Sequence, residues 1–149
     1  MNGAAQPRIT VHNRLRKIAV DDGELQRFAE RALPLCLREP GGGPGLMSLE
    51  EIQVLLISDR RMSELHRRFL GIFGPTDVIT FQHGEIFISV ETARRYARMQ
   101  RTSLAHELRL YLVHGLLHLH GFDDHTPADQ ERIRLAQERI VACAGGAGG

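Results

Sequence analysis

A chain of 149 residues is long enough to bury a substantial hydrophobic core and short enough to form one domain. Hydrophobic residues make up 42% and charged residues 25% of it, as in ordinary globular proteins, and no apolar run approaches the roughly 18 residues of a membrane span. The net charge of +1 indicates no strongly basic domain, and the N-terminal residues lack the apolar segment of a secretory signal. We therefore expect one cytoplasmic domain over residues 1–149, with flexible tails at residues 1–7 and 145–149.

The first predicted elements are a strand and a helix. Residues 9–12 alternate between apolar and polar side chains, which favours a short strand. Asp21 or Asp22 would cap a helix over residues 23–37, and Pro34 is expected to kink or shorten that helix.

The middle of the chain predicts another strand and helix, followed by a hairpin. Residues 51–57 are rich in branched apolar side chains, which is typical of a strand, and a helix is expected over residues 60–69. Two further strands are predicted at residues 77–81 and 85–89. Only three residues separate them, which favours an antiparallel hairpin.

Three more helices are predicted over residues 90–98, over residues 104–119, and from Pro127 to about residue 143. Proline suits the first turn of a helix, because the first N–H groups have no partner inside the helix. The whole pattern predicts an α+β fold, in which a small mixed β-sheet packs with about five helices.

The helix predicted over residues 104–119 carries the strongest functional signal. His114 and His118 are four residues apart, so both side chains project from one helix face, as two ligands of one metal ion would. Gly121 is suited to end the helix, and the turn after it could return Asp124 or His125 as a third ligand. Three protein ligands leave the fourth tetrahedral position of zinc open to water. The segment therefore predicts a metalloprotein.

Two other histidines and one glycine limit this prediction. His120 is two positions from His118 and points to another face, so a solvent-facing or supporting role is expected. His106 is rotated by roughly 80° from His114 and is not expected to be a ligand. Gly115 stands where H-E-x-x-H zinc proteases place their general-base glutamate, which disfavours that class.

The basic residues are almost all arginine, and eight of the nineteen form two groups. The first group is Arg60, Arg61, Arg67 and Arg68, and the second is Arg94, Arg95, Arg98 and Arg101. Arginine matches phosphate with a planar pair of donors, so either group could bind an RNA backbone. The alternative is that both groups are only solvated helix faces.

Two sequence blocks resemble a known family. The run HGLLHLHGFDD from residue 114 to residue 124 resembles the H-G-x-L-H-L-x-G-[YF]-D-H signature of the YbeY family of metal-dependent endoribonucleases. GPTDVITF at residues 74–81 and GEIFIS at residues 84–89 resemble that family's P-T-D-V-L-S-F and G-D-I-x-I-S blocks. The order and spacing of the blocks also match, and the resemblance covers roughly residues 52–140.

This resemblance implies a zinc-dependent endoribonuclease that acts in rRNA maturation and in ribosome assembly and quality control. It implies Zn²⁺ as cofactor and RNA, either an rRNA precursor or the ribosome, as partner, with no DNA or membrane partner. By their places in the motifs, His114 and Asp124 would be catalytic. Thr76 and Asp77 would help to shape a substrate-binding cleft, although they could equally form only the polar turn that opens a strand.

Two residues, Asp124 and His125, are candidates for the third metal ligand. In the family it is a histidine six positions after the second ligand, and six positions after His118 stands Asp124, with His125 one further. We expect the metal ligands to be His114, His118 and His125, because the family uses imidazole. Asp124 in place of His125 keeps the register instead, and zinc accepts either ligand type.

One departure from the family pattern bears on activity. In the family block L-N-x-x-[YF]-R-G the arginine is functional, but Leu70 stands in its place here. Arg67 or Arg68 could substitute although neither is in register, and Arg68 is taken as a candidate RNA contact. Two alternative functions follow: a non-catalytic ribosome-assembly factor with a structural zinc, or a metal-dependent hydrolase or peptidase of other specificity.

Overall fold

The computed structural model describes residues 5–41, 45–70 and 77–145 of the chain. In chain order its elements are β1 (Arg8–Asn13), α1 (Asp22–Leu37), the 3₁₀ helix η1 (Gly45–Ser48), β2 (Glu51–Ile57), α2 (Asp59–Leu70), β3 (Val78–Phe81), β4 (Glu85–Ser89), α3 (Val90–Gln100), α4 (Leu104–Leu119) and α5 (Pro127–Ala144). The predicted helices and strands all form, with ends within two residues of the expected ones, and η1 is an addition to them.

The four strands form one mixed sheet in the order β1-β2-β4-β3. β1 and β4 run parallel to β2, whereas β3 runs antiparallel to β4, so the predicted hairpin is confirmed. Gly84 closes the hairpin with a φ of 118°, which side chains rarely permit, and its N–H donates to the carbonyl of Phe81. Sheet and helices together confirm the α+β class.

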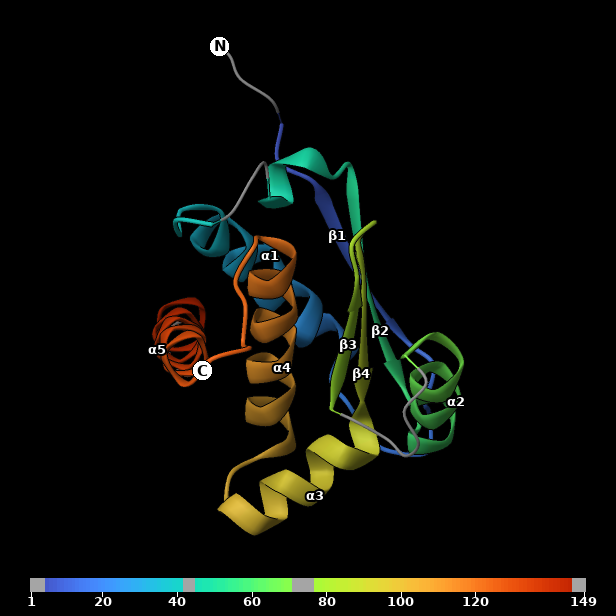
Figure 1. The fold of residues 1–149 in the computed structure, drawn as a ribbon. Coiled ribbons are helices and arrows are strands. Elements are labelled where there is room, and N and C mark those ends of the chain that lie inside the picture. Colours follow the sequence, from blue (N-terminus) through green and yellow to red (C-terminus); the bar gives the residue numbers. More distant parts are fainter. Residues whose placement is uncertain (1–4, 42–44, 71–76, 146–149) are drawn as a thin grey trace.

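Helices cover the two faces of the sheet unequally. α1 and α4 pack on one face with α5 beyond them, while α2 lies on the opposite face (Figure 1). α4 contacts α1, α3, α5, β3 and β4, so other elements enclose most of its surface. This position explains why apolar side chains occur around most of α4 and not along a single stripe.

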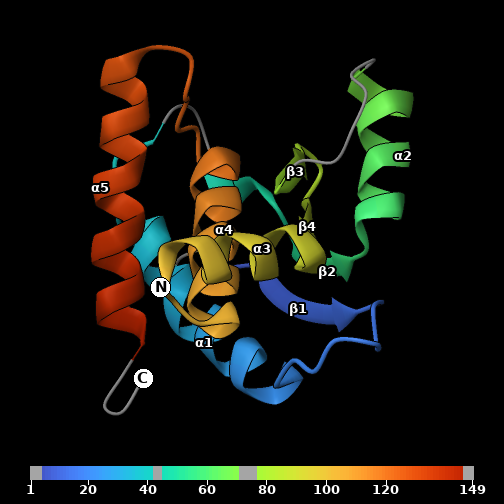
Figure 2. The same cartoon turned by 90° about the horizontal axis from the view of Figure 1, so that it is seen from below.

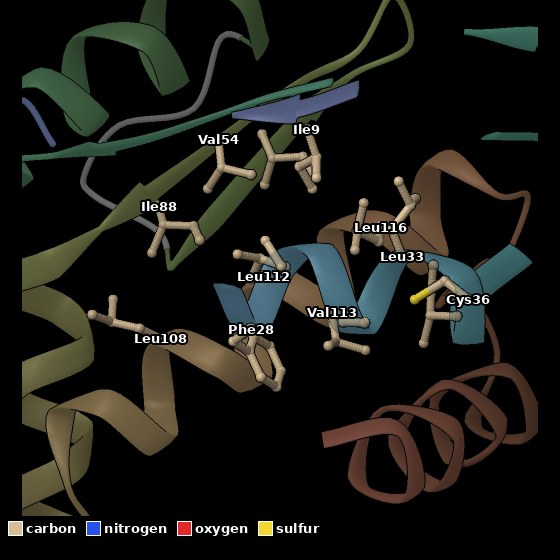
Figure 3. Close-up of a cluster of buried hydrophobic side chains, with 14 of the residues drawn as sticks. Ile9, Phe28, Leu33, Cys36, Val54, Ile88, Leu108, Leu112, Val113 and Leu116 are labelled. Carbon is tan, nitrogen blue, oxygen red and sulfur yellow. The ribbon is translucent and has the colours of Figure 1, made fainter. Parts of the chain in front are cut away.

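The main hydrophobic core lies between the sheet and the helices α1 and α4. Figure 3 shows side chains of the sheet, such as Val54 and Ile88, meeting those of the helices, such as Phe28, Leu112 and Leu116. All five are buried. Burying one such side chain contributes about 1.5–3 kcal/mol, so this core fixes the position of α4 on the sheet.

A smaller core holds α2 against the other face of the sheet. Met62 and Leu65 of α2 are buried with Ile57 and Ile79 of the strands. Phe69, in the last turn of α2, differs from Met62 and Leu65, because 55% of it is exposed. α2 therefore packs along its first turns and presents an aromatic ring to solvent at its end.

The carboxylate of Asp59 joins α2 to β4 and α3. Its Oδ1 accepts hydrogen bonds from the hydroxyls of Ser89 at 2.5 Å and Thr92 at 2.7 Å, and its Oδ2 pairs with Arg95 at 2.6 Å. Burial alone would raise the pKa of Asp59, but these three partners outweigh burial and hold the pKa below its usual value. The charged carboxylate therefore ties together the N-terminal ends of α2 and α3.

α1 keeps its predicted end although it contains Pro34. The helix is not shortened there but continues to Leu37. Leu33 and Cys36, on either side of the proline, are both buried in the core, so packing holds the last turn in place despite the missing N–H.

Parts of the predicted tails, residues 1–4 and 146–149, lie outside the described residues, whereas Pro7 is buried. Within the described part of the chain, no helix has both the length and the apolar character needed to cross a membrane.

Candidate metal centre

His114 and His118 lie one turn apart on the same face of α4. Their Nε2 atoms are 3.1 Å apart, and their ring centroids are 4.6 Å apart. Both residues are partly exposed, whereas Val113 and Leu117, next to them in the chain, are fully buried. The two imidazoles therefore occupy the face of α4 that the hydrophobic core leaves open.

The turn after α4 returns Asp124 toward the two histidines. Gly121 has a φ of 105°, which lets the chain reverse direction directly after the helix C-cap. Oδ2 of Asp124 lies 3.4 Å from Nε2 of His118. The carbonyl of Asp124 accepts a hydrogen bond from Nε2 of Gln130 at 3.1 Å, which ties the turn to α5.

Three side chains thus present ligand atoms to a common point. One nitrogen each of His114 and His118 and a carboxylate oxygen of Asp124 all lie within 4.8 Å of one another. Ligand atoms about 2.1 Å from a tetrahedral zinc ion are about 3.4 Å from each other. The measured separations of 3.1 Å and 3.4 Å are close to this value, so the group could hold a metal ion with only small side-chain movements.

Gln137 of α5 orients the first imidazole. Nδ1 of His114 lies 2.9 Å from Oε1 of Gln137. Because an amide oxygen can only accept, Nδ1 carries the proton and the lone pair of Nε2 points toward the group. Histidines that bind metal ions commonly donate their other ring N–H in this way, which fixes both the tautomer and the ring orientation.

Burial lowers the pKa of His118, and the neighbouring His114 lowers it further. Asp124 and a hydrogen bond with the backbone of Phe122 act in the opposite direction without restoring the usual value. The imidazole of His118 is therefore neutral at pH 7, which is the form that binds a metal ion.

The group opens into a cleft of about 290 Å³. Its lining comes from α2, β3, α4 and the turn after α4, and consists of His66, Asp77, Val78, Ile79, Thr80, His114, His118 and Asp124. Figure 2 shows α4 and β3 side by side, with α5 and α2 on the two outer sides. The cleft thus lies at the β3 edge of the sheet and has titratable groups on two of its walls.

The other predicted site residues have different positions. His125 lies outside the ligand group: its side chain is 82% exposed, and its Nε2 is 3.8 Å from Oδ1 of Asp123. Asp77 lines the cleft, and Thr76 lies outside the described residues. Arg68 is exposed, with its guanidinium 5.5 Å from the ring centroid of Phe69.

The expectation for His120 needs correction, because its side chain is buried and serves the fold. Its Nδ1 accepts a hydrogen bond from the N–H of Leu46 at 3.2 Å, and its Nε2 lies 2.8 Å from the carbonyl oxygen of Glu39. A Cβ on Gly41 would clash with the carbonyl oxygen of His120, so the chain before β2 is in direct contact with the end of α4. This segment, which is distant in the sequence, packs over the side of α4 that helical spacing predicts to face solvent.

Sequence reasoning missed two residues of the site, Gln137 and His66. Gln137 follows His114 by 23 residues and reaches it only because α5 packs along α4. His66 comes from α2, on the far wall of the cleft. The sequence offered one signal for His66: it lies in the stretch before Gly71 that is compared with the family block L-N-x-x-[YF]-R-G.

Gly115 has a packing reason for its place between the two histidines. A Cβ at this position would lie 2.6 Å from Cγ2 of Ile86, which is fully buried in β4. A glutamate therefore does not fit there without displacing α4 from the sheet. The structure thus supports the exclusion of an H-E-x-x-H protease.

A comparison with protein families matches residues 10–145 to the family described as Endoribonuclease YbeY. Among curated proteins, one of that name from Thermus thermophilus is 37% identical over 124 residues, covering 75% of this chain and 86% of the relative. Another of that name, from Anaeromyxobacter sp. Fw109-5, is 38% identical over 105 residues, covering 64% of this chain. The match spans only about half of that relative's length, 55%.

A solved structure is also similar, the solution structure of TM1509 from Thermotoga maritima. It superimposes with a TM-score of 0.59 at 24% identity, covering 90% of this chain and 89% of the other. At that identity the likeness concerns the fold alone.

Proposed function

Because this chain belongs to the YbeY family, we propose that it is a zinc-dependent endoribonuclease that cleaves single-stranded RNA during rRNA maturation. We further propose that it works in the cytoplasm, on an rRNA precursor or on the ribosome itself. The proposal rests mainly on one observation: His114, His118 and Asp124, which line one cleft, bring their ligand atoms within 4.8 Å of one another.

The donor set suits zinc, with Asp124 as the third ligand in preference to His125. Two imidazole nitrogens and one carboxylate oxygen are common zinc ligands. Asp124 is within 3.4 Å of His118, whereas the exposed side chain of His125 is directed toward Asp123. When bound, the ion would supply Lewis-acid chemistry, which polarises a phosphoryl oxygen and activates water near neutral pH.

The chain's own residues have distinct tasks in this scheme. Gln137 keeps the proton of His114 on Nδ1, and burial keeps His118 neutral, so both imidazoles are ready to act as ligands at pH 7. His66 and Asp77 line the same cleft and would exchange protons with the reacting phosphodiester or its water. Arg68 would hold an RNA phosphate, and Thr76 with Asp77 would help to shape the cleft.

Two features favour this function over its rivals. A structural zinc is normally enclosed by four protein ligands, but only three converge among the described residues, which favours an open position. A peptidase of the H-E-x-x-H class would need a glutamate where Gly115 packs against Ile86.

The test combines metal analysis with RNA cleavage. Wild type is expected to contain about one zinc ion per chain and to cut a single-stranded rRNA fragment, and His118→Ala is expected to lose both properties. His106→Ala is the matched control, because His106 is an exposed histidine on the same helix outside the ligand group. Full metal content and activity in His118→Ala, or cleavage of peptide in place of RNA, would contradict the proposal.

A further inference from the structure

A partly exposed aromatic surface lies at the end of α2 and the tip of the β3–β4 hairpin. We call it the aromatic face and define it as Phe69, Phe81 and His83. Phe69 is 55% exposed, His83 is exposed, and Phe81 is half-buried. The exposure of Phe69 is notable because the other described apolar residues of α2, Met62 and Leu65, are buried, and burying its ring would contribute about 1.5–3 kcal/mol.

The rings of the aromatic face are held in a fixed arrangement. The centroid of Phe81 lies 5.4 Å from that of Phe69, with the rings nearly perpendicular, and 6.0 Å from that of His83, with the rings stacked at 24°. Phe87 supports Phe81 from β4 at 5.7 Å, and Nε2 of His83 pairs with Oε1 of Glu85 at 2.7 Å. The rings are therefore a preorganised surface, which lowers the entropy lost on binding a flat ligand.

Positive charge adjoins this surface. The guanidinium of Arg68 lies 5.5 Å from the ring centroid of Phe69. Arg67 and Arg68 are exposed, and neither pairs with a carboxylate of the described residues. A guanidinium beside an aromatic ring keeps its N–H donors available for phosphate. The aromatic face therefore combines rings that could stack on bases with arginines that could bind phosphate.

The aromatic face continues from the cleft of the candidate metal centre. His66, one turn before Phe69 on α2, lines the cleft. Ile79, two positions before Phe81 and therefore on the same face of β3, lines it as well. An extended strand of RNA that leaves the cleft along β3 would therefore reach these rings within a few residues of the β-strand.

We propose that the aromatic face is a subsite on which unpaired bases of single-stranded RNA stack, next to the cleft where the chain would be cut. This inference rests on the proposed function and adds the way in which the substrate is held. Every base has a π-face, so such a subsite would recognise unpaired RNA with little regard to sequence. The combination of rings and exposed arginines favours nucleic acid over an apolar protein partner.

The chain contains no tryptophan, which permits a direct test. Phe69→Trp places the only tryptophan of the chain in the aromatic face, and excitation near the red edge of indole absorption avoids the two tyrosines. Oligoadenylate is expected to quench its emission, whereas an abasic sugar-phosphate oligomer of the same length is expected to leave it unchanged. Leu135→Trp is the matched control, because Leu135 is 50% exposed on α5 and lies outside the aromatic face and outside both arginine groups. Its emission is expected not to respond to either oligomer.

Affinity provides the second measurement. Phe69→Leu keeps an apolar contact with Phe81 but removes the ring, and it is expected to weaken oligoadenylate binding about fivefold or more. Phe69→Trp is expected to bind at least as tightly as wild type.

The outcomes separate this inference from the proposed function. If wild type itself binds no RNA, both are overturned. If wild type binds, but Phe69→Leu binds equally well and the emission of Phe69→Trp is not quenched, only the stacking subsite is overturned. Unchanged RNA affinity of Phe69→Leu with lost binding to ribosomal proteins would assign the face to a protein partner and also overturn it.

Discussion

Gln137, in the middle of α5, accepts a hydrogen bond of 2.9 Å from Nδ1 of His114. Gln137→Leu removes the acceptor and frees the imidazole to rotate or to change tautomer. Because such supporting hydrogen bonds typically change metal affinity about 10- to 100-fold, we expect zinc affinity to fall by that amount. Competition with a chromophoric chelator measures it directly.

Two further variants complete that experiment. Gln137→Glu keeps an acceptor and is expected to hold zinc as tightly as wild type or more tightly. Gln100→Leu makes the same kind of change at an exposed position at the end of α3 and is expected to have no effect. Equal affinities for Gln137→Leu and wild type would show that the contact does not orient the ligand.

Gly115→Ala tests how closely α4 approaches the sheet. The added Cβ would lie 2.6, 3.1 and 3.2 Å from three atoms of Ile86, so the whole buried side chain must move. Overpacking of this kind costs about 1–3 kcal/mol, against a helix-propensity gain of about 1 kcal/mol. We therefore expect a net loss of about 1 kcal/mol or more in the free energy of unfolding, measured by chemical denaturation.

The cause of that loss can be isolated. In an Ile86→Ala background the added methyl group has space, and Gly115→Ala is expected to become neutral or stabilising there. Gly23→Ala is the control, because a Cβ at Gly23 would be 3.4 Å from the flexible side chain of Arg27. It should be neutral or stabilising by up to about 1 kcal/mol. Identical effects of Gly115→Ala in both backgrounds would rule out the contact with Ile86 as the cause.

The junction at Asp59 predicts a pH dependence of stability. The pKa of this carboxyl is held below its usual value by Arg95, Ser89 and Thr92, against the effect of burial. A depressed pKa means that the carboxylate stabilises the fold above its unfolded pKa of about 3.9, and that this contribution is lost as the pH falls through the folded pKa. Asp59→Asn is thus expected to be clearly less stable than wild type at pH 7, with the difference shrinking below about pH 4.

Both proteins are compared with a chelator present, so that metal release in acid does not enter the difference. Glu131→Gln serves as control, because Glu131 pairs with Arg134 on the open surface, where water screens the interaction. Its stability difference from wild type should be close to zero at every pH. A constant difference between Asp59→Asn and wild type from pH 7 to pH 3 would contradict the assigned role.

The sequence predicts the elements of this fold well where local periodicity decides them. The bounds of α4, the antiparallel hairpin and the pairing of His114 with His118 all follow from spacings of a few residues. At Pro34 the sequence allows a kink or a shorter helix, and the helix is not shortened, because the core buries Leu33 and Cys36 on either side of the proline.

Long-range packing limits how much of the site can be predicted from the sequence. Gln137 and His66 approach the histidines from helices whose positions only the assembled core determines. His120 is enclosed by the segment before β2, more than 70 positions earlier in the chain. The choice between Asp124 and His125 depends on the path of the turn after Gly121, and both residue types are chemically suitable, so composition and spacing could not decide it.

That choice gives the most direct test of the proposed metal centre. Asp124→Ala and His125→Ala are purified in parallel, and the zinc content and dissociation constant of each are compared with wild type. Because Oδ2 of Asp124 lies 3.4 Å from Nε2 of His118 and the side chain of His125 is 82% exposed, Asp124→Ala is expected to lose zinc while His125→Ala retains it. Loss of zinc from His125→Ala, with full zinc content in Asp124→Ala, would contradict the centre as proposed here.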